Sequence, residues 1–224
     1  MTHTIKISLI AAFLVFSLCL LAPGKAAAAS EARQALENTI NEVLAELQKP
    51  GLHDPAERKA IEANIERIVL TLFSFEELSM RTVGPAWRNF TPDQKKRFID
   101  AFENLLRERY IEALEMYRSS GSGGETVTVL RESPIGTSGD RVQIDTTVAA
   151  GNQSVSISYR MQRGQDGRWM VFDITIEGVG MVQNYRSQFQ SVLQRGNAEE
   201  LISLVRARAE QAREENAQKR QGQS

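Results

Sequence analysis

The chain has 224 residues, of which 42% are apolar and 25% charged, a composition typical of a globular protein with a sizeable core. Its 27 basic residues nearly balance its 28 acidic residues, so the formal net charge is −1. Nucleic-acid-binding proteins usually carry a basic stripe or patch, and this balance gives no electrostatic reason to expect a nucleic-acid partner.

The first 29 residues have the layout of a secretory signal peptide. Lys6 precedes an apolar run over residues 7–22, and small residues near Ala27–Ala29 suit cleavage. A membrane-spanning helix needs roughly 20 apolar residues, and this run is shorter. We therefore predict export with removal of residues 1–29, and an uncleaved membrane anchor is the alternative interpretation.

The only cysteine, Cys19, lies inside this apolar run. Leu18 precedes it where a lipoprotein would carry a small residue, so we do not expect lipidation. Removal of Lys6 and Lys25 leaves 25 basic against 28 acidic residues, and no cysteine, in the mature chain. An exported protein without disulfides must be held together by its core.

Four helical segments are predicted before the middle of the chain. Apolar residues recur at helical spacing over residues 30–49, and Asp54-Pro55 starts a second helix that runs to about Leu72. Ser74 and Thr91 each precede an acidic or amide residue by three positions, which predicts a capped start for a short and a long helix. The long helix carries an aromatic stripe that is typical of a core face.

The segment after a Gly/Ser-rich joint at residues 119–124 has the alternating pattern of strands. Turn sequences separate neighbouring segments, so we predict antiparallel hairpins with one apolar and one polar face. The four predicted strands cover residues 126–131, 141–148, 154–161 and 169–177.

The final part of the chain returns to helical spacing. Gly178 and Gly180 stand where the period changes, and helices are expected over residues 181–195 and from Asn197 onward. Residues 211–224 are polar and charged, which predicts a disordered tail after a domain at residues 30–210.

The mature sequence offers little for catalysis. It contains no cysteine, no His and acid pair at metal-ligand spacing and no phosphate-binding glycine loop, so we expect no metal and no cofactor. Asp145 and Asp173 are the carboxylates most suited to act as a general base, and the alternative is that they face solvent or pair with Arg141 or Arg160.

These elements predict an α+β fold in which helices before and after a curved four-stranded antiparallel sheet enclose an apolar interior. That interior is a ligand cavity if the side chains do not fill it. Sequence patterns do not separate a filled core from a hollow one.

Two stretches resemble the family of MlaC, the periplasmic phospholipid-binding component of an ABC transport system, also called toluene-tolerance (Ttg) auxiliary proteins. They are Phe73-Ser-Phe-Glu-Glu-Leu-Ser-Met with the following Gly84–Phe98, and Asp173-Ile-Thr-Ile-Glu-Gly-Val with Asn184-Tyr-Arg-Ser-Gln-Phe189. The resemblance extends over about Ala35 to Val205. Ser74, Leu78 and Gly180 depart from the family pattern and leave open a hopanoid-associated relative.

The resemblance implies a periplasmic carrier that is not an enzyme and has a phospholipid ligand. Its partners would be an outer-membrane lipoprotein–porin complex and an inner-membrane ABC transporter with its substrate-binding ring, and its role would be to maintain outer-membrane lipid asymmetry. Two other functions stay open, namely a small-molecule enzyme that uses Asp145 or Asp173 and a structural adaptor.

Candidate lipid contacts are apolar or aromatic residues on the inward faces of the predicted helices and strands, and each is equally a candidate for plain core. They are Phe73, Phe75, Leu78, Phe98, Phe102, Leu105, Tyr110, Val142, Ile144, Val155, Ile157, Tyr159, Met161, Val179, Met181, Val182, Tyr185 and Phe189.

Overall fold

A computed structural model describes residues 30–52, 54–119, 126–150 and 153–221, and residues from Glu31 onward form one compact unit. The predicted signal peptide with its cleavage position and residues 120–124 of the joint lie outside the described residues. None of the described helices is both long enough and apolar enough to cross a membrane.

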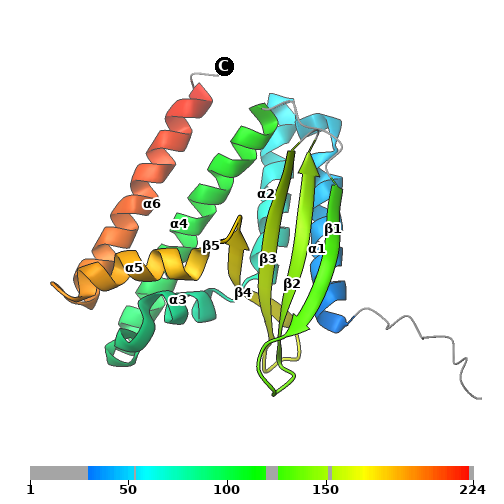
Figure 1. Cartoon of the computed structure of the whole chain (residues 1–224). Coiled ribbons are helices and arrows are strands. Elements are labelled where there is room, and N and C mark those ends of the chain that lie inside the picture. The colour runs from blue at the N-terminus through cyan, green and yellow to red at the C-terminus, as the bar shows by residue number, and fades with distance from the viewer. Residues whose placement is uncertain (1–29, 53, 120–125, 151–152, 222–224) are drawn as a thin grey trace, which may run out of the picture. The chain divides into compact units, whose positions relative to one another are not determined.

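Helices precede and follow the sheet, as the sequence predicts (Figure 1). In chain order the elements are α1 (Glu31–Leu47), η1 (Pro50–Leu52), α2 (Pro55–Leu72), α3 (Phe75–Val83), η2 (Gly84–Asn89), α4 (Pro92–Ser119), β1 (Thr126–Pro134), β2 (Arg141–Ala150), β3 (Gln153–Arg163), β4 (Trp169–Ile176), β5 (Val179–Gly180), α5 (Met181–Leu193) and α6 (Ala198–Gln221).

Side-chain caps fix several helix starts. Ser74 accepts a hydrogen bond from the Glu77 amide at the start of α3. Thr91 and Gln94 form a reciprocal capping box at the start of α4, with distances of 3.2 and 3.0 Å between side-chain oxygen and amide nitrogen. Asn197 accepts from the amide of Glu199 at the start of α6. The caps at Ser74 and Thr91 are the ones that the sequence predicts.

The sheet is antiparallel in the order β1-β2-β3-β4-β5, so the predicted fold class is confirmed and the strand count of four is corrected to five. The extra strand is the two-residue β5, which pairs with the end of β4. Glu177 and Gly178 turn the chain between them with φ angles of 47° and 80°. Two consecutive positive φ angles make the tight hairpin that returns the chain to β4.

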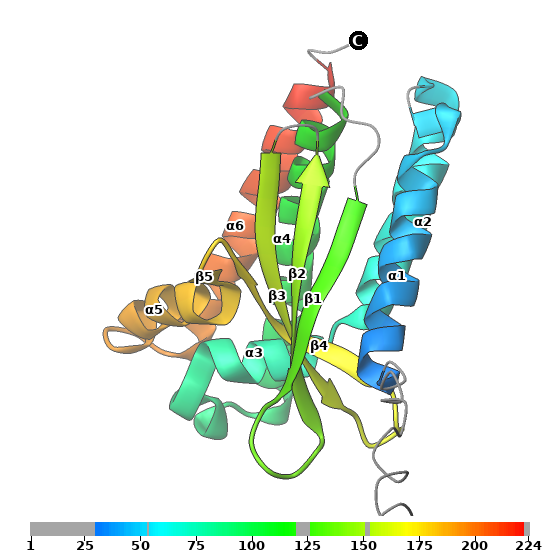
Figure 2. The ribbon, with the colours of Figure 1, turned by 45° about the vertical axis from the view of Figure 1, so that its right-hand side comes forward.

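The sheet has one apolar and one polar face. Ile144, Met161 and Val171 are fully buried from the sheet side in a core that includes Leu36 of α1 and Leu72 of α2. Figure 2 shows α1 and α2 side by side, and both helices contact β4.

The opposite face of the sheet carries a polar network around Asp145. Asp145 accepts hydrogen bonds from the Ser158 hydroxyl at 2.7 Å and from Arg131 at 2.8 Å. The alternation of side chains along β2 and β3 therefore places apolar residues on one face of the sheet and polar residues on the other, as the sequence predicts.

A second core lies among α3, α4, α5 and α6. Phe98, Phe102 and Phe189 are fully buried there, with ring centroids 5.6–5.8 Å apart. The two cores meet at Phe73, which packs against both and forms a parallel bridge with Val171 of β4.

Helix α6 extends to Gln221, so residues 211–221 are not the disordered tail that their polarity predicted. Ala212 and Asn216 are buried, and the Asn216 side chain donates hydrogen bonds to the main-chain carbonyl and the carboxylate of Glu108 on α4. Small side chains let α6 lie close to α4. This packing holds residues 211–221 in the helix, although they lack the stripe of large apolar residues from which the sequence would predict a packed helix.

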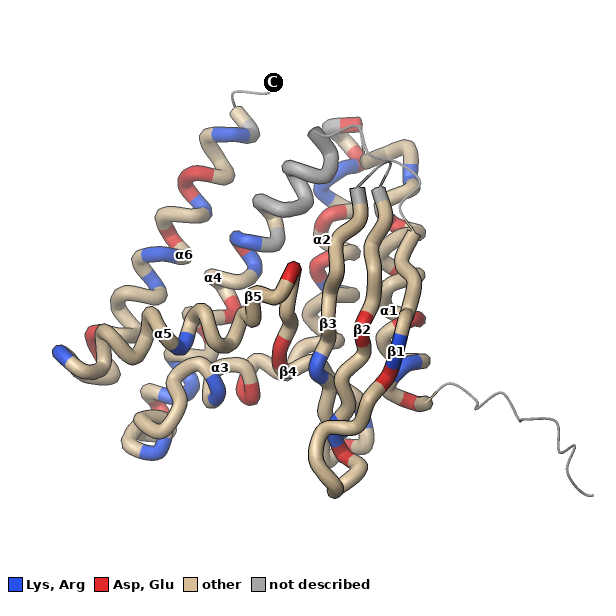
Figure 3. Tube along the Cα trace, viewed as in Figure 1, with Lys and Arg blue, Asp and Glu red and all other residues tan. Residues whose placement is uncertain are grey.

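Charged residues of both signs are mixed along the elements (Figure 3). On α6, for example, both signs occur between residues 206 and 214, with Arg206, Arg208 and Arg213 interspersed with Glu210 and Glu214. The described part of the trace thus shows charge intermixed rather than collected into a basic stripe, which agrees with the near-neutral composition.

We expect Gly178→Val to lower the free energy of unfolding by about 1–2 kcal/mol, because a β-branched residue is strained at a φ of 80°. No atom lies within 4 Å of the position where a Cβ would be added, so the loss would come from the backbone. Urea unfolding of the wild type and the variant measures the difference in the free energy of unfolding.

The matched control is Gly180→Ser, where φ is −78° and serine is a good helix cap. Gly180→Ser should leave the free energy of unfolding unchanged or slightly raised. Equal stability of wild type and Gly178→Val would contradict the turn assignment.

Candidate functional site

An apolar cavity of about 610 Å³ lies between α2, α4 and the β4–β5–α5 segment. Ten of the fourteen described residues that line it are apolar or aromatic. The lining consists of Glu66, Val69, Leu70, Phe73, Phe75, Leu106, Arg107, Arg109, Ile174, Ile176, Val179, Met181, Asn184 and Tyr185. Its volume lies in the range of small-molecule and cofactor sites.

Three local features of the chain build this cavity. The break between α2 and α3 turns the neighbouring Phe73 and Phe75 rings inward, with centroids 6.1 Å apart. The pleat of β4 places Ile174 and Ile176 on one face. The hairpin after Ile176 then brings Val179 back beside it as a cross-strand pair.

The cavity opens at the β4–β5 hairpin. Ile176 and Val179 line it and are nevertheless 50% and 64% exposed, which is unusual for large apolar side chains. The charged part of the lining includes Arg107, whose guanidinium pairs with Glu66 at 2.5 Å. An apolar wall with a few polar groups is the pattern of a site for a largely apolar ligand.

A smaller apolar cavity of about 310 Å³ adjoins the first between α1, α2 and the sheet. Val69, Phe73 and Ile174 line both, so these three side chains form the partition. Tyr159 also lines the smaller cavity, and its burial raises the pKa of the phenol to about 12. The two cavities together provide apolar space on both sides of Phe73.

Six of the residues predicted as lipid contacts line these cavities. Phe73, Phe75, Val179, Met181 and Tyr185 line the larger one, and Tyr159 lines the smaller one. Most of these come from the chain around the α2–α3 break and from the strand-to-helix switch, the two stretches that carry the family resemblance.

Eight other predicted contacts are core residues in the structure. They are at most 9% exposed, contact other protein side chains and line neither apolar cavity, which corresponds to the alternative of plain core. They are Leu78, Phe98, Phe102, Leu105, Ile144, Met161, Val182 and Phe189.

The remaining predicted contacts are Val142, Val155, Ile157 and Tyr110. The first three are half-buried and line neither apolar cavity. The Tyr110 side chain lies outside the described part of the chain.

Sequence reasoning missed five apolar residues of the larger cavity together with the polar part of its lining, namely Val69, Leu70, Leu106, Ile174 and Ile176. Their helical or strand periodicity marks an inward face, but it does not show whether a neighbour fills the space opposite. The alternation of Ile174 and Ile176 in β4 was the one available signal.

The two carboxylates considered as general bases line neither apolar cavity. Asp173 is buried, accepts a hydrogen bond from the Val182 amide at 3.1 Å and lies 3.6 Å from Arg160. It therefore caps α5 and pairs with β3. The pKa of Asp145 is lowered, first by the Ser158 hydroxyl. Both positions correspond to the structural alternative, and the described residues contain no cluster suited to a metal ion.

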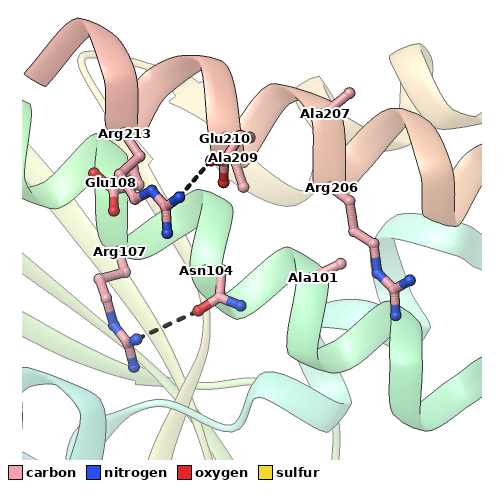
Figure 4. Close-up of a pocket in the computed structure, with 9 residues that line it drawn as sticks. All are labelled: Ala101, Asn104, Arg107, Glu108, Arg206, Ala207, Ala209, Glu210 and Arg213. Carbon is pink, nitrogen blue, oxygen red and sulfur yellow. Dashed lines mark hydrogen bonds and ion pairs between the residues drawn. The ribbon is translucent and has the colours of Figure 1, made fainter.

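A third depression, of about 690 Å³, lies in the groove between α4 and α6 (Figure 4). It is larger than the apolar cavity but its lining is charged or small, including Arg107, Arg213 and Glu210. Arg213 pairs with Glu210, and Arg107 donates to Asn104 at 3.3 Å. Acyl or other apolar groups gain nothing from such a surface, so the apolar cavity of about 610 Å³ is the candidate site.

Comparisons with known proteins point to one family. A family model described as MlaC protein matches residues 37–207. The intermembrane phospholipid transport system binding protein MlaC of Haemophilus influenzae is 20% identical over 145 residues, which are 64% of this chain. That match covers 65% of the relative, slightly less than two thirds of its length.

A solved structure also shares the fold. It is that of a phospholipid-binding protein from Ralstonia solanacearum in complex with a phospholipid, with a TM-score of 0.69 and 23% sequence identity. The likeness covers 82% of this chain and 99% of that one.

We expect the free energy of unfolding to decrease between about pH 10 and pH 12 because of the Tyr159 phenol. Because its folded-state pKa is about 12 and an unfolded tyrosine titrates near 10, the folded state keeps a proton that the unfolded state loses. The contribution is fully present below pH 10, and up to about 2–3 kcal/mol is lost as the pH rises through the folded pKa.

Urea unfolding of wild type and Tyr159→Phe at pH 9 and pH 11.5 isolates this contribution, because other titrations cancel in the difference. The variant should lose less stability than wild type over this interval. Identical losses would show that the Tyr159 phenol is not buried as described.

Proposed function

Since this chain belongs to the MlaC protein family, we propose that it binds a phospholipid, with the acyl chains in the apolar cavity, and carries it between membranes. The observation that carries the proposal is the cavity of about 610 Å³ with its apolar wall and its opening beside Ile176 and Val179. The names of the Haemophilus and Ralstonia proteins support the choice of ligand.

The energetics of an acyl chain in water explain why a carrier is useful. Each exposed methylene costs about 0.8 kcal/mol, so two chains of roughly fifteen carbons cost on the order of 20 kcal/mol. A cavity that replaces water with apolar side chains removes most of this cost. The affinity of the carrier for the lipid then needs only to be close to that of the membrane, so that lipid can be accepted and released. None of its residues has to make or break a covalent bond.

The site of action and the partners are part of the same proposal. The signal-like residues 1–29 support export to the periplasm. The partners would be an outer-membrane lipoprotein–porin complex and an inner-membrane ABC transporter with its substrate-binding ring. Transfer between these two complexes would maintain the lipid asymmetry of the outer membrane.

Native mass spectrometry of the purified, gently released mature protein tests this function. Stoichiometric phospholipid is the expected result. Well-folded protein that has not been stripped of lipid and carries none would overturn the proposal.

We expect Leu70→Glu to reduce bound phospholipid by about ten-fold or more, because a carboxylate in the cavity wall loses its hydration beside acyl chains. Leu70 lines the cavity but belongs to neither packed core, so the fold should survive. Lipid extraction and mass spectrometry measure the ratio of lipid to protein.

Leu130→Glu is the matched control, because Leu130 is 62% exposed on β1 and lines none of the cavities described above. It should retain wild-type lipid content. Equal loss in both variants, or loss in neither, would argue against the cavity as the site of binding.

A further inference from the structure

The smaller apolar cavity, of about 310 Å³, has a wall without charge. None of the eleven described residues that line it is charged, and its polar groups are the hydroxyls of Thr39 and Tyr159. The Thr39 hydroxyl already donates to the main-chain carbonyl of Ala35 at 3.0 Å, and burial raises the pKa of the Tyr159 phenol. The described lining of the larger cavity, by contrast, includes charged and amide side chains, namely Glu66, Arg107, Arg109 and Asn184. Because hydrocarbon offers no hydrogen bonds to such groups, the end of an acyl chain is better accommodated in the smaller cavity.

Strand β4 leads from the opening of the larger cavity to the smaller one. Ile176 is 50% exposed at the opening. Ile174 lies on the same face of the strand, roughly 7 Å further along it, and lines both cavities. An acyl chain that follows this apolar face inward therefore reaches the partition, whose other members are Val69 and Phe73.

The partition between the two cavities is made of side chains that are not close-packed. Val69, Phe73 and Ile174 are each half-buried and have apolar space on both sides. Core residues such as Phe98 and Met161 are fully buried. A side chain beside a void lacks the contacts that hold a core residue in one position, so the partition can rearrange without disturbing either core.

The backbone of Phe73 is fixed, while its side chain has a choice of rotamers. Phe73 bridges to Val171, and the amide of Ser74 donates to the Val171 carbonyl at 3.0 Å. As the C-cap of α2, Phe73 has an extended backbone with φ −97° and ψ 141°. Extended backbone accommodates both of the common χ1 rotamers, near 180° and near −60°. The ring can therefore turn aside while β4 stays in place.

We propose that Phe73 and Val69 set the length of the acyl chain that the protein accepts, because turning the Phe73 ring aside admits the end of a long chain to the smaller cavity. This inference rests on the proposed function and adds a determinant of chain length. A chain short enough for the larger cavity leaves the partition in place. A longer chain puts its last methylenes between α1, α2 and the sheet, where they are removed from water.

Photo-cross-linking shows where the end of a bound chain lies. The purified mature protein is stripped of lipid and loaded from vesicles of phosphatidylglycerol with a diazirine at the end of acyl chains of roughly eighteen carbons. Mass spectrometry after irradiation should find cross-links on α1, which lines the smaller cavity and not the larger one. Cross-links confined to residues that line only the larger cavity, such as Leu70 and Met181, would overturn the proposal.

Two variants of Val69 change the partition in opposite directions. Val69→Phe adds a ring beside Phe73 and should reduce the cross-linking of α1 by about ten-fold. Val69→Ala widens the passage and should raise the cross-linking of α1. Equal cross-linking in wild type and both variants would show that the chain end does not pass the partition.

The preference for chain length gives an independent readout. Vesicles contain equal amounts of phosphatidylglycerol with chains of roughly twelve and roughly eighteen carbons. Wild type should load both lipids in the ratio of the vesicle. Val69→Phe should discriminate against the longer lipid by about ten-fold or more, which corresponds to about two methylenes left without an apolar environment. Discrimination of the same size in wild type would contradict the role of the smaller cavity.

Val43→Phe fills the smaller cavity from α1 without changing a residue of the partition. It should discriminate against the longer lipid as Val69→Phe does. Asn38→Phe is the matched control, because it adds the same ring to the same helix at an exposed position that lines neither apolar cavity. It should keep the wild-type ratio. A wild-type ratio in Val43→Phe would overturn the proposal.

The outcomes separate this inference from the proposed function. Absence of both lipids from folded wild-type protein would refute the carrier function itself. Uptake of both lipids in the wild-type ratio by Val69→Phe and Val43→Phe would refute the role of the partition alone. Thermal melting of each variant verifies that it is folded.

Discussion

The parallel bridge between Phe73 and Val171 is a backbone link between the two halves of the domain. The Ser74 amide donates to the Val171 carbonyl at 3.0 Å, which attaches the α2–α3 break to β4. On one side of this point α1 and α2 pack on the sheet, and on the other α3, α4, α5 and α6 pack on one another. Because the link is made by backbone, it leaves the Phe73 side chain free to separate the two apolar cavities.

The cavity follows from this division. Helices α4 and α6 satisfy their apolar faces mainly against each other and against α3 and α5, so they do not fill the space beside α2 and β4. The buried carboxylate of Asp173 strengthens the junction by accepting a hydrogen bond from the Val182 amide at the start of α5. The cavity thus coexists with close-packed hydrophobic cores on either side of it.

The site is amphipathic in the same sense as its proposed ligand. Apolar side chains of α2, β4 and β5 share the lining of the cavity with Arg109 of α4 and Asn184 of α5, and the Tyr185 ring, which also lines the cavity, packs on Phe102. Binding of such a ligand depends on where the apolar and polar parts of the site meet, rather than on reactive side chains.

The sequence by itself determined the order of elements, the helix caps, the antiparallel sheet and the family resemblance, because each rests on local periodicity or on short motifs. It also indicated Phe73, Phe75 and the strand-to-helix switch as parts of the site. Only the tertiary structure decided that Phe98, Phe102 and Phe189 fill a core whereas Leu70 and Ile176 line a cavity, since an inward-facing side chain has the same periodicity in both cases. The helical end of α6 was likewise decided by its packing on α4. Ala212 can be buried there because it is small, and Asn216 because its side chain donates a hydrogen bond to Glu108.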